Sequence, residues 1–322
     1  MAKENVTNES YEESLKKELA NSEDHKVTFS SGKNSTVRKE LEAARDQNGY
    51  HNIELDKLPS RGLFYPTNTR ICFRSLRIDE VKDISSLDES NLIDVYQGLN
   101  KIINSCVQVW YSNTRGNYRD LLKCDELYIM FLIRELTYPG VTLPLDIPKG
   151  ACKTAGCNSE KSIDIRVSET NLESPFDPEL MKYYSETERK FVFTTKGGEV
   201  FKMKPATIGS HAAAFDYAVE MEKSSTSYDK ASLAMMTVFE DWEKMNTQYI
   251  EKFATDIIGW PLAKYNLLYN LQTKVEKIGN DLFAHVTCPA CGGQMVIPCT
   301  FPGNIKELLI PVVSSESDYG LV

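Results

Sequence analysis

Residues 285–299 have the sequence HVTCPACGGQMVIPC, in which Cys288 and Cys291, with two residues between them, lie on a turn between two strand-like runs. The two glycines after the pair allow the tight backbone turn that such a loop needs. A second pair, Cys152 and Cys157, lies in the sequence CKTAGC and also falls between alternating runs, at 143–147 and 163–167. Cysteine pairs on two hairpin turns are the arrangement of a zinc ribbon.

The four paired cysteines predict one metal site. Thiolates from Cys152, Cys157, Cys288 and Cys291 can close a tetrahedron around Zn²⁺, which has no geometric preference of its own. We therefore expect one structural zinc ion per chain, with no open coordination position. Because 130 residues lie between the two pairs, the intervening segment has to form an insertion.

Other interpretations of these cysteines stay open. The four thiols could be reduced and free of metal, or Cys288 and Cys291 could form a redox pair, although the βαβ setting of a thioredoxin site is missing. Cys299 follows a proline on the second strand and is interpreted as a core residue, yet it could replace a ligand. His285 is a further candidate, with a surface or supporting role as the simpler interpretation.

Outward from the cysteines, the patterns predict an α+β fold of helices with short β-hairpins and a zinc-ribbon-like pair of Cys₂ knuckles. We divide the chain into a flexible N-terminal arm (1–50), a strand plus helical N-terminal domain (51–137), the first half of the ribbon (138–168), a hairpin plus helical insertion (169–282), the second half of the ribbon (283–310) and a C-terminal tail (311–322).

Individual elements follow from periodicity and turn residues. Residues 70–78, RICFRSLRI, alternate as a strand whose arginines should face water, and 91–110 and 121–136 have helical spacing. The glycines at 197–198 predict a hairpin within 191–204, and 211–278 should be helical, with breaks at 224–225 and 259–261.

The sequence also predicts the environment of several single residues and of one segment. Cys72, Cys106 and Cys124 should pack in the core. The acidic pairs Asp125–Glu126 and Glu240–Asp241 should belong to solvated helix faces. Residues 58–66, LPSRGLFYP, should anchor the chain by packing, with a docking peptide for a partner as the alternative.

Composition limits the function classes. The chain has 37 Lys and Arg residues against 46 Asp and Glu, a net charge of −9, which argues against a surface devoted to nucleic acid. No apolar run approaches the roughly 20 residues of a membrane span, and residues 1–26 do not look like a signal peptide. A reducing compartment is expected, where cysteines are thiols or metal ligands. The four histidines fall in no HExxH motif and near no GxSxG turn, so we expect no enzyme.

The ordered succession of four motifs resembles a known family. These are LPSRGLFYP (58–66) followed by the arginine-rich strand, LLKCDELYIMFLIRELTY (121–138), FKMKPATIGS (201–210) and VTCPACGGQMVIP (286–298). Together they are similar to the baseplate hub subunits of T4-like contractile-tailed bacteriophages, over roughly residues 55–305.

The resemblance implies a non-enzymatic structural or assembly component of a tail baseplate. Its partners would be other hub proteins and the tape-measure protein, with a homo-oligomer possible, first in the host cytoplasm and then in the virion tail. The metal positions that it implies are again the four paired cysteines. The alternative is a nucleic-acid-binding zinc-ribbon protein, which the few lysines near the knuckles, Lys149, Lys153 and Lys161, make less favourable.

Overall fold

The computed structural model describes residues 49–157, 162–279, 281–299 and 305–311. Every described residue belongs to one unit of the chain, Glu40–Val322. The expected arm at 1–50, apart from its last two residues, and the expected tail at 311–322, apart from Pro311, lie outside the described residues. Helices and small antiparallel sheets both occur, which confirms the α+β fold class.

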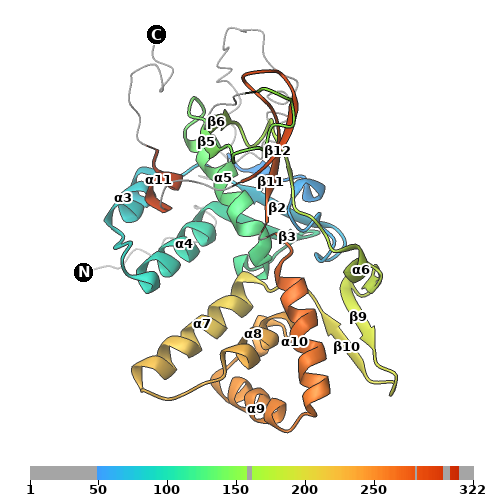
Figure 1. Cartoon of the computed structure of the whole chain (residues 1–322). Coiled ribbons are helices and arrows are strands. Elements are labelled where there is room, and N and C mark those ends of the chain that lie inside the picture. The colour runs from blue at the N-terminus through green and yellow to red at the C-terminus, as the bar shows by residue number, and fades with distance from the viewer. Residues whose placement is uncertain (1–48, 158–161, 280, 300–304, 312–322) are drawn as a thin grey trace, which may run out of the picture. The chain divides into compact units, whose positions relative to one another are not determined.

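The first part of the unit combines an antiparallel sheet with three helices (Figure 1). The sheet has the order β1-β2-β3-β4, with the strands His51–Asn52, Thr69–Phe73, Val107–Tyr111 and Thr114–Arg115. The helices are α3 (Ile78–Ser86), α4 (Leu92–Cys106) and α5 (Glu126–Thr137). Short 3₁₀ turns lie at Leu55–Lys57, Tyr118–Asp120 and Lys123–Asp125.

Three further small sheets follow. One pairs β5 (Leu143–Asp146) with β6 (Ser162–Ile165), and another has the order β12-β11-β7, with the strands Gln294–Pro298, Phe283–Thr287 and Asn171–Glu173. The last has the order β10-β9-β8, with the strands Val200–Met203, Lys190–Thr194 and Tyr184–Ser185. The hairpin expected within 191–204 is therefore confirmed, with Phe201 opposite Phe193.

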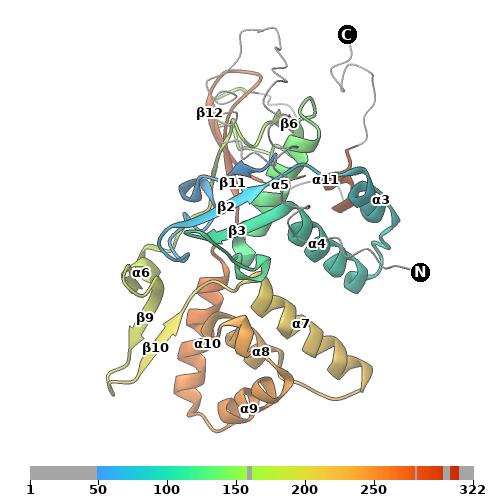
Figure 2. The ribbon, with the colours of Figure 1, turned by 180° about the vertical axis from the view of Figure 1, so that it is seen from behind.

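The helical segment contains α7 (Ile208–Lys223), α8 (Lys230–Phe239), α9 (Thr247–Ile258) and α10 (Leu262–Glu276), with a 3₁₀ turn at Trp242–Lys244. Figures 1 and 2 show α8 flanked by α7 and α10, which it contacts. Two short helices, α6 (Pro178–Met181) and α11 (Ile305–Leu309), complete the described elements. None of the helices in the described ranges is long and apolar enough to cross a membrane.

One expected helix is too long. The helical spacing over 91–110 holds only to Cys106, and Val107–Tyr111 is strand β3, paired with β2 from Thr69 to Phe73. Its sequence VQVWY alternates, with Val107 and Val109 buried in the core. A β-branched, alternating run thus forms the central strand even though its apolar residues continue the helical period.

The expectation that all arginines of 70–78 face water is wrong for Arg74. This side chain is buried and forms two hydrogen bonds with Glu80, at 2.9 and 2.6 Å, and its Nη2 also donates to the carbonyl of Ser105 at 2.9 Å. The pairing with Glu80 raises the pKa of Arg74 and keeps the charge in place. A buried arginine directly after strand β2 is tolerated here because a carboxylate of α3 meets its planar guanidinium.

Asp125 and Glu126 are also buried rather than solvated. Asp125 accepts hydrogen bonds from the Ser60 amide at 2.8 Å, the Ser60 hydroxyl at 2.7 Å and the Tyr65 hydroxyl at 2.8 Å. We call this arrangement the Asp125 latch. It fixes the segment 58–66 to the start of α5, and it is strong because the acceptor is a carboxylate in a dry environment.

The segment 58–66 therefore packs as an anchor. Leu58, Phe64 and Tyr65 are buried, and Phe64 lies 5.2 Å from Phe191 and 5.6 Å from Tyr184, measured between ring centroids. These contacts join the first part of the unit to the sheet β10-β9-β8. Cys72, Cys106 and Cys124 are buried, as expected.

Gly279, three residues beyond the end of α10, provides a test of backbone conformation. Its φ is +80°, and a Cβ there would lie 2.4 Å from Cys124 Cβ and 2.6 Å from the Cys124 carbonyl oxygen. We expect Gly279→Ala to lower the free energy of unfolding by about 2 to 4 kcal/mol, because it adds a steric clash to left-handed strain. Gly198→Ala is the matched control, with φ +82° and no atom within 4 Å. Urea unfolding of both variants measures the difference, and equal losses would contradict the role of the clash.

Candidate metal centre

The structure places the four paired cysteines on two hairpin connections. Cys152 and Cys157 lie between β5 and β6, and Cys288 and Cys291 lie between β11 and β12. Each hairpin is fixed to the core by its strands: Leu145 and Ile297 are both completely buried. The second knuckle is closed by two backbone hydrogen bonds, from the Cys288 amide to the Gly293 carbonyl at 2.8 Å and from the Gly292 amide to the Cys288 carbonyl at 2.9 Å.

The sulfur atoms of the two hairpins come together. All four Sγ atoms lie within 4.8 Å of one another, with 3.5 Å between Cys152 and Cys291 and 3.7 Å between Cys157 and Cys288. Four sulfurs bound about 2.3 Å from a central zinc ion would lie about 3.8 Å apart. The sulfur spacing therefore fits a tetrahedral metal site.

Gly293 permits the close approach of the knuckles. A Cβ at this position would lie 2.9 Å from the Thr154 hydroxyl oxygen and 3.4 Å from the Cys291 sulfur. Thr154, in the first knuckle, is 3.5 Å from that same sulfur. We did not identify Thr154 from the sequence, where its only signal is a hydroxyl side chain inside CKTAGC.

The electrostatics of the cluster favour a bound cation. Hydrogen bonds from Thr154 and from the Gly293 amide to the thiolate lower the pKa of Cys291 to about 6. In contrast, the pKa of Cys157 is raised to about 12. The largest cause is the neighbouring sulfur of Cys291, followed by burial and by the sulfurs of Cys152 and Cys288. Thiolates within 4.8 Å of one another repel, so a positive charge among them would favour the ionised form of the cluster. A metal ion supplies that charge.

The cluster is accessible from one side. Cys288 is buried, Cys152 and Cys157 are half-buried, and Cys291 is exposed. These four residues could hold a metal ion, and four sulfur donors suit zinc better than magnesium or calcium, which take oxygen ligands.

The two substitute ligands lie outside this cluster. Cys299 is half-buried and packs against the hydrophobic core, and burial raises its pKa to about 11. The Nε2 atom of His285 lies 2.9 Å from a carboxylate oxygen of Glu173 on the neighbouring strand β7. Both residues belong to strands or their ends rather than to the knuckles, in agreement with their interpretation as core and surface residues.

Comparison of the chain with protein-family models, curated proteins and solved structures finds no match.

Proposed function

We propose that this chain is a non-enzymatic structural or assembly protein of a bacteriophage tail baseplate, in which one zinc ion holds two distant hairpins together. The observation that carries the zinc site is the meeting of four thiols within 4.8 Å from hairpins that lie 131 to 139 positions apart in the sequence. Such a site stabilises a fold and performs no reaction, because four thiolates occupy every position of a tetrahedral ion.

The baseplate assignment is supported by the family resemblance and by the way the motifs pack. Two of the four motifs, 58–66 and 121–138, are joined through the Asp125 latch. The third motif meets the second where the Lys123 amide donates to the Ala206 carbonyl at 2.8 Å and the Ile208 amide to the Leu121 carbonyl at 2.7 Å. Three of the four motifs behind the resemblance thus contact one another in the fold.

A protein that works through its surface also needs exposed contact groups. At the corner between α9 and α10, Ile258 and Leu262 have exposed fractions of 82% and 74%. Apolar side chains exposed to this degree at the ends of two successive helices suit contact with another protein. Hub and tape-measure proteins of the same tail are the partners we propose, first in the host cytoplasm and then in the virion.

The proposal is tested in the phage that encodes the chain. A nonsense mutation early in the gene should prevent the formation of complete baseplates, seen by electron microscopy of lysates, and a plasmid copy should restore them. Infectious particles with normal tails in the absence of the chain would overturn the baseplate role. Fluorescence anisotropy with single- and double-stranded DNA and RNA should show no binding at physiological salt, and salt-dependent binding would favour the nucleic-acid alternative instead.

A further inference from the structure

Three residues of the sheet β1-β2-β3-β4 form a row across its strands. Arg70 of β2 is the register partner of Trp110 of β3, and Trp110 is the partner of Arg115 of β4. Strands β2 and β3 lie side by side in Figure 2. Directly opposed residues of antiparallel strands point to the same face, so the Cα atoms of the two arginines lie about 10 Å apart on either side of the tryptophan. We call these three residues the Arg–Trp row.

The Arg–Trp row lies on the face of the sheet opposite the hydrophobic core. Ile71 and Val109, next to Arg70 and Trp110 in the sequence, point the other way and are buried in the core. Arg70 and Arg115 are exposed, and Trp110 is half-buried. An indole between two arginines on a sheet surface has the composition of an interface hot spot, where Trp and Arg are both enriched.

The two arginines of the row carry charges without an acidic partner in the described ranges. There, the ion pairs of arginines belong to Arg61, Arg74 and Arg166. Arg70 instead lies over the ring of Trp110, with its Cζ atom 5.6 Å from the ring centroid. The row therefore presents two positive charges to the solvent, beside an aromatic ring that favours a nearby cation.

The other two tryptophans of the chain show what accompanies such a pair elsewhere. Each has a cation over its ring and an acidic side chain in contact with the pair: Arg119 and Asp120 at Trp242, and Lys264 and Glu199 at Trp260. In the Arg–Trp row, the indole of Trp110 donates to the neutral amide oxygen of Gln108 at 3.2 Å. Within the described ranges, no carboxylate takes the corresponding place in the row.

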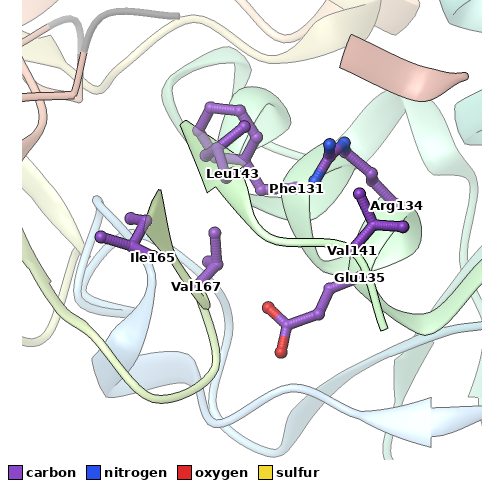
Figure 3. A pocket seen from close by; sticks show the side chains of 7 residues that line it. All are labelled: Phe131, Arg134, Glu135, Val141, Leu143, Ile165 and Val167. Carbon is purple, nitrogen blue, oxygen red and sulfur yellow. The ribbon is translucent and has the colours of Figure 1, made fainter. Parts of the chain in front are cut away.

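Access distinguishes the Arg–Trp row from the arginine at the small internal cavity. Arg134 lines the space between α5 and the β5–β6 hairpin, where Figure 3 shows its guanidinium. The walls of this cavity lie too close together to admit a water molecule, so no ligand enters it. A partner can reach Arg70 and Arg115 without any rearrangement of the fold, because both side chains are exposed.

We propose that the Arg–Trp row binds an acidic segment of another protein, whose carboxylates pair with Arg70 and Arg115 on either side of Trp110. A guanidinium presents planar N–H donors that match the two oxygens of a carboxylate. In an extended segment, alternate residues lie about 7 Å apart on one side, so two acidic residues at such positions come within reach of both long arginine side chains. This contact does not depend on the proposed function.

A protein segment fits the row better than nucleic acid does. Two cations are few compared with the roughly six to ten phosphate contacts of a typical DNA-binding protein. Arg70 already covers one face of the Trp110 ring, on which a base would otherwise stack. The net charge of −9 also repels a long polyphosphate beyond the row, whereas a short acidic segment meets only the two arginines.

Fluorescence anisotropy of the full chain tests the contact with a defined probe, a fluorescein-labelled ten-residue peptide of alternating glutamate and serine. The wild type should bind this peptide, and binding should weaken with rising salt because the contact is electrostatic. Arg70→Gln and Arg115→Gln should each raise the dissociation constant about three- to tenfold, since each removes one ion pair. If the wild type does not bind the peptide even at low salt, the proposal is wrong.

Arg166→Gln is the matched control. It removes the same charge from an exposed arginine that directly follows β6, in another sheet, and it should leave the dissociation constant unchanged. Equal weakening by Arg166→Gln and Arg70→Gln would indicate general attraction between charges and would overturn the proposal. Equally tight binding of a peptide with glutamine in place of glutamate would overturn it as well.

Indole NMR signals locate the peptide on the wild-type protein, which covers the case in which an arginine variant fails to fold. The chain has three tryptophans, so the ¹H–¹⁵N spectrum contains three indole signals, which Trp→Phe variants assign. The unlabelled glutamate peptide should shift the signal of Trp110. It should leave the signal of Trp260 in place, because Lys264 beside that ring is already paired with Glu199. A titration that leaves the Trp110 signal unchanged contradicts the proposal.

Two further measurements identify other occupants of the row. A labelled ten-nucleotide oligothymidylate that binds more tightly than the peptide, and loses this binding in Arg70→Gln, would identify a nucleic-acid site and overturn the proposal. Self-association in analytical ultracentrifugation that Arg70→Gln abolishes would identify a second copy of this chain as the occupant, with the same consequence. We expect neither result.

Discussion

Replacing Cys152 or Cys288 by serine should remove the bound zinc and unfold both hairpins of the ribbon. Structural zinc binding contributes on the order of 10 kcal/mol in peptide models, which is as large as the whole stability of an ordinary domain. A metal ion shared by the four thiols would also close a long loop, because Cys157 and Cys288 lie 131 positions apart, and closure of such a loop removes conformational entropy from the unfolded chain. We expect one zinc ion per chain by elemental analysis of the wild type and almost none in either variant.

The double variant distinguishes one shared site from two separate ones. Cys152→Ser combined with Cys288→Ser should be little worse than either single change, because each already breaks the same site. Cys299→Ser is the matched control and should keep the metal, since this cysteine packs against the core. Full zinc content in Cys152→Ser together with loss of zinc in Cys288→Ser would contradict a shared site, and Cys299 or His285 would then have to complete the tetrahedron.

Asp125→Ala should lower the free energy of unfolding by about 3 to 5 kcal/mol, because it leaves the three donors of the Asp125 latch without an acceptor in a dry environment. Ser60 is completely buried and Tyr65 almost so, and water cannot replace the lost carboxylate without opening the structure. Asp125→Asn keeps one acceptor oxygen and the same volume, and its loss should be clearly smaller. Thermal unfolding of the metal-loaded proteins measures both changes. Equal, small losses would show that the latch contributes little.

The latch should also respond to pH. Burial raises the pKa of Asp125 to about 6, despite the hydrogen bonds from Ser60 and Tyr65 that favour the carboxylate. An unfolded aspartate has a pKa of about 3.9, so the folded state binds the proton more tightly. The tighter proton binding of Asp125 stabilises the folded state in full below about pH 4, and this contribution is lost as the pH rises through about 6. The unfolding midpoint of the wild type, relative to Asp125→Asn, should therefore fall between pH 4 and 7. Parallel pH profiles would contradict this assignment.

The elements that the sequence predicted well are those with a strong local signal. The alternating runs at 143–147, 163–167 and 191–204 became paired strands, and the knuckle turns follow from the cysteine and glycine spacing. The four cysteines come together as expected because strands on both sides of each pair determine where the turns lie. The identity of the metal and the division into domains stay predictions.

The errors concern residues whose environment is set by tertiary contacts that the local sequence pattern does not reveal. Nothing near Asp125 indicates that Ser60 and Tyr65, 65 and 60 positions away, fold onto it. Arg74 and Glu80 are close in sequence, but an i,i+6 pair has no regular local geometry, and their burial depends on the packing of α3 beside α4. Strand β3 was missed for a related reason, since only its pairing with β2 distinguishes it from a continued helix. Tertiary contacts outweigh local periodicity in all three places.

The distance between the two cysteine pairs has a consequence for synthesis. At about 5 to 20 residues per second, the ribosome needs roughly 7 to 26 seconds to add the 131 positions from Cys157 to Cys288. During that time only the two sulfurs of the first knuckle, out of the four in the complete site, are available to an ion. A chain that terminates early never acquires the complete site, so its unprotected thiols and open hairpin distinguish it from a finished molecule. If the four cysteines bind a metal ion as proposed, the complete site can form only after Cys291 has been synthesised.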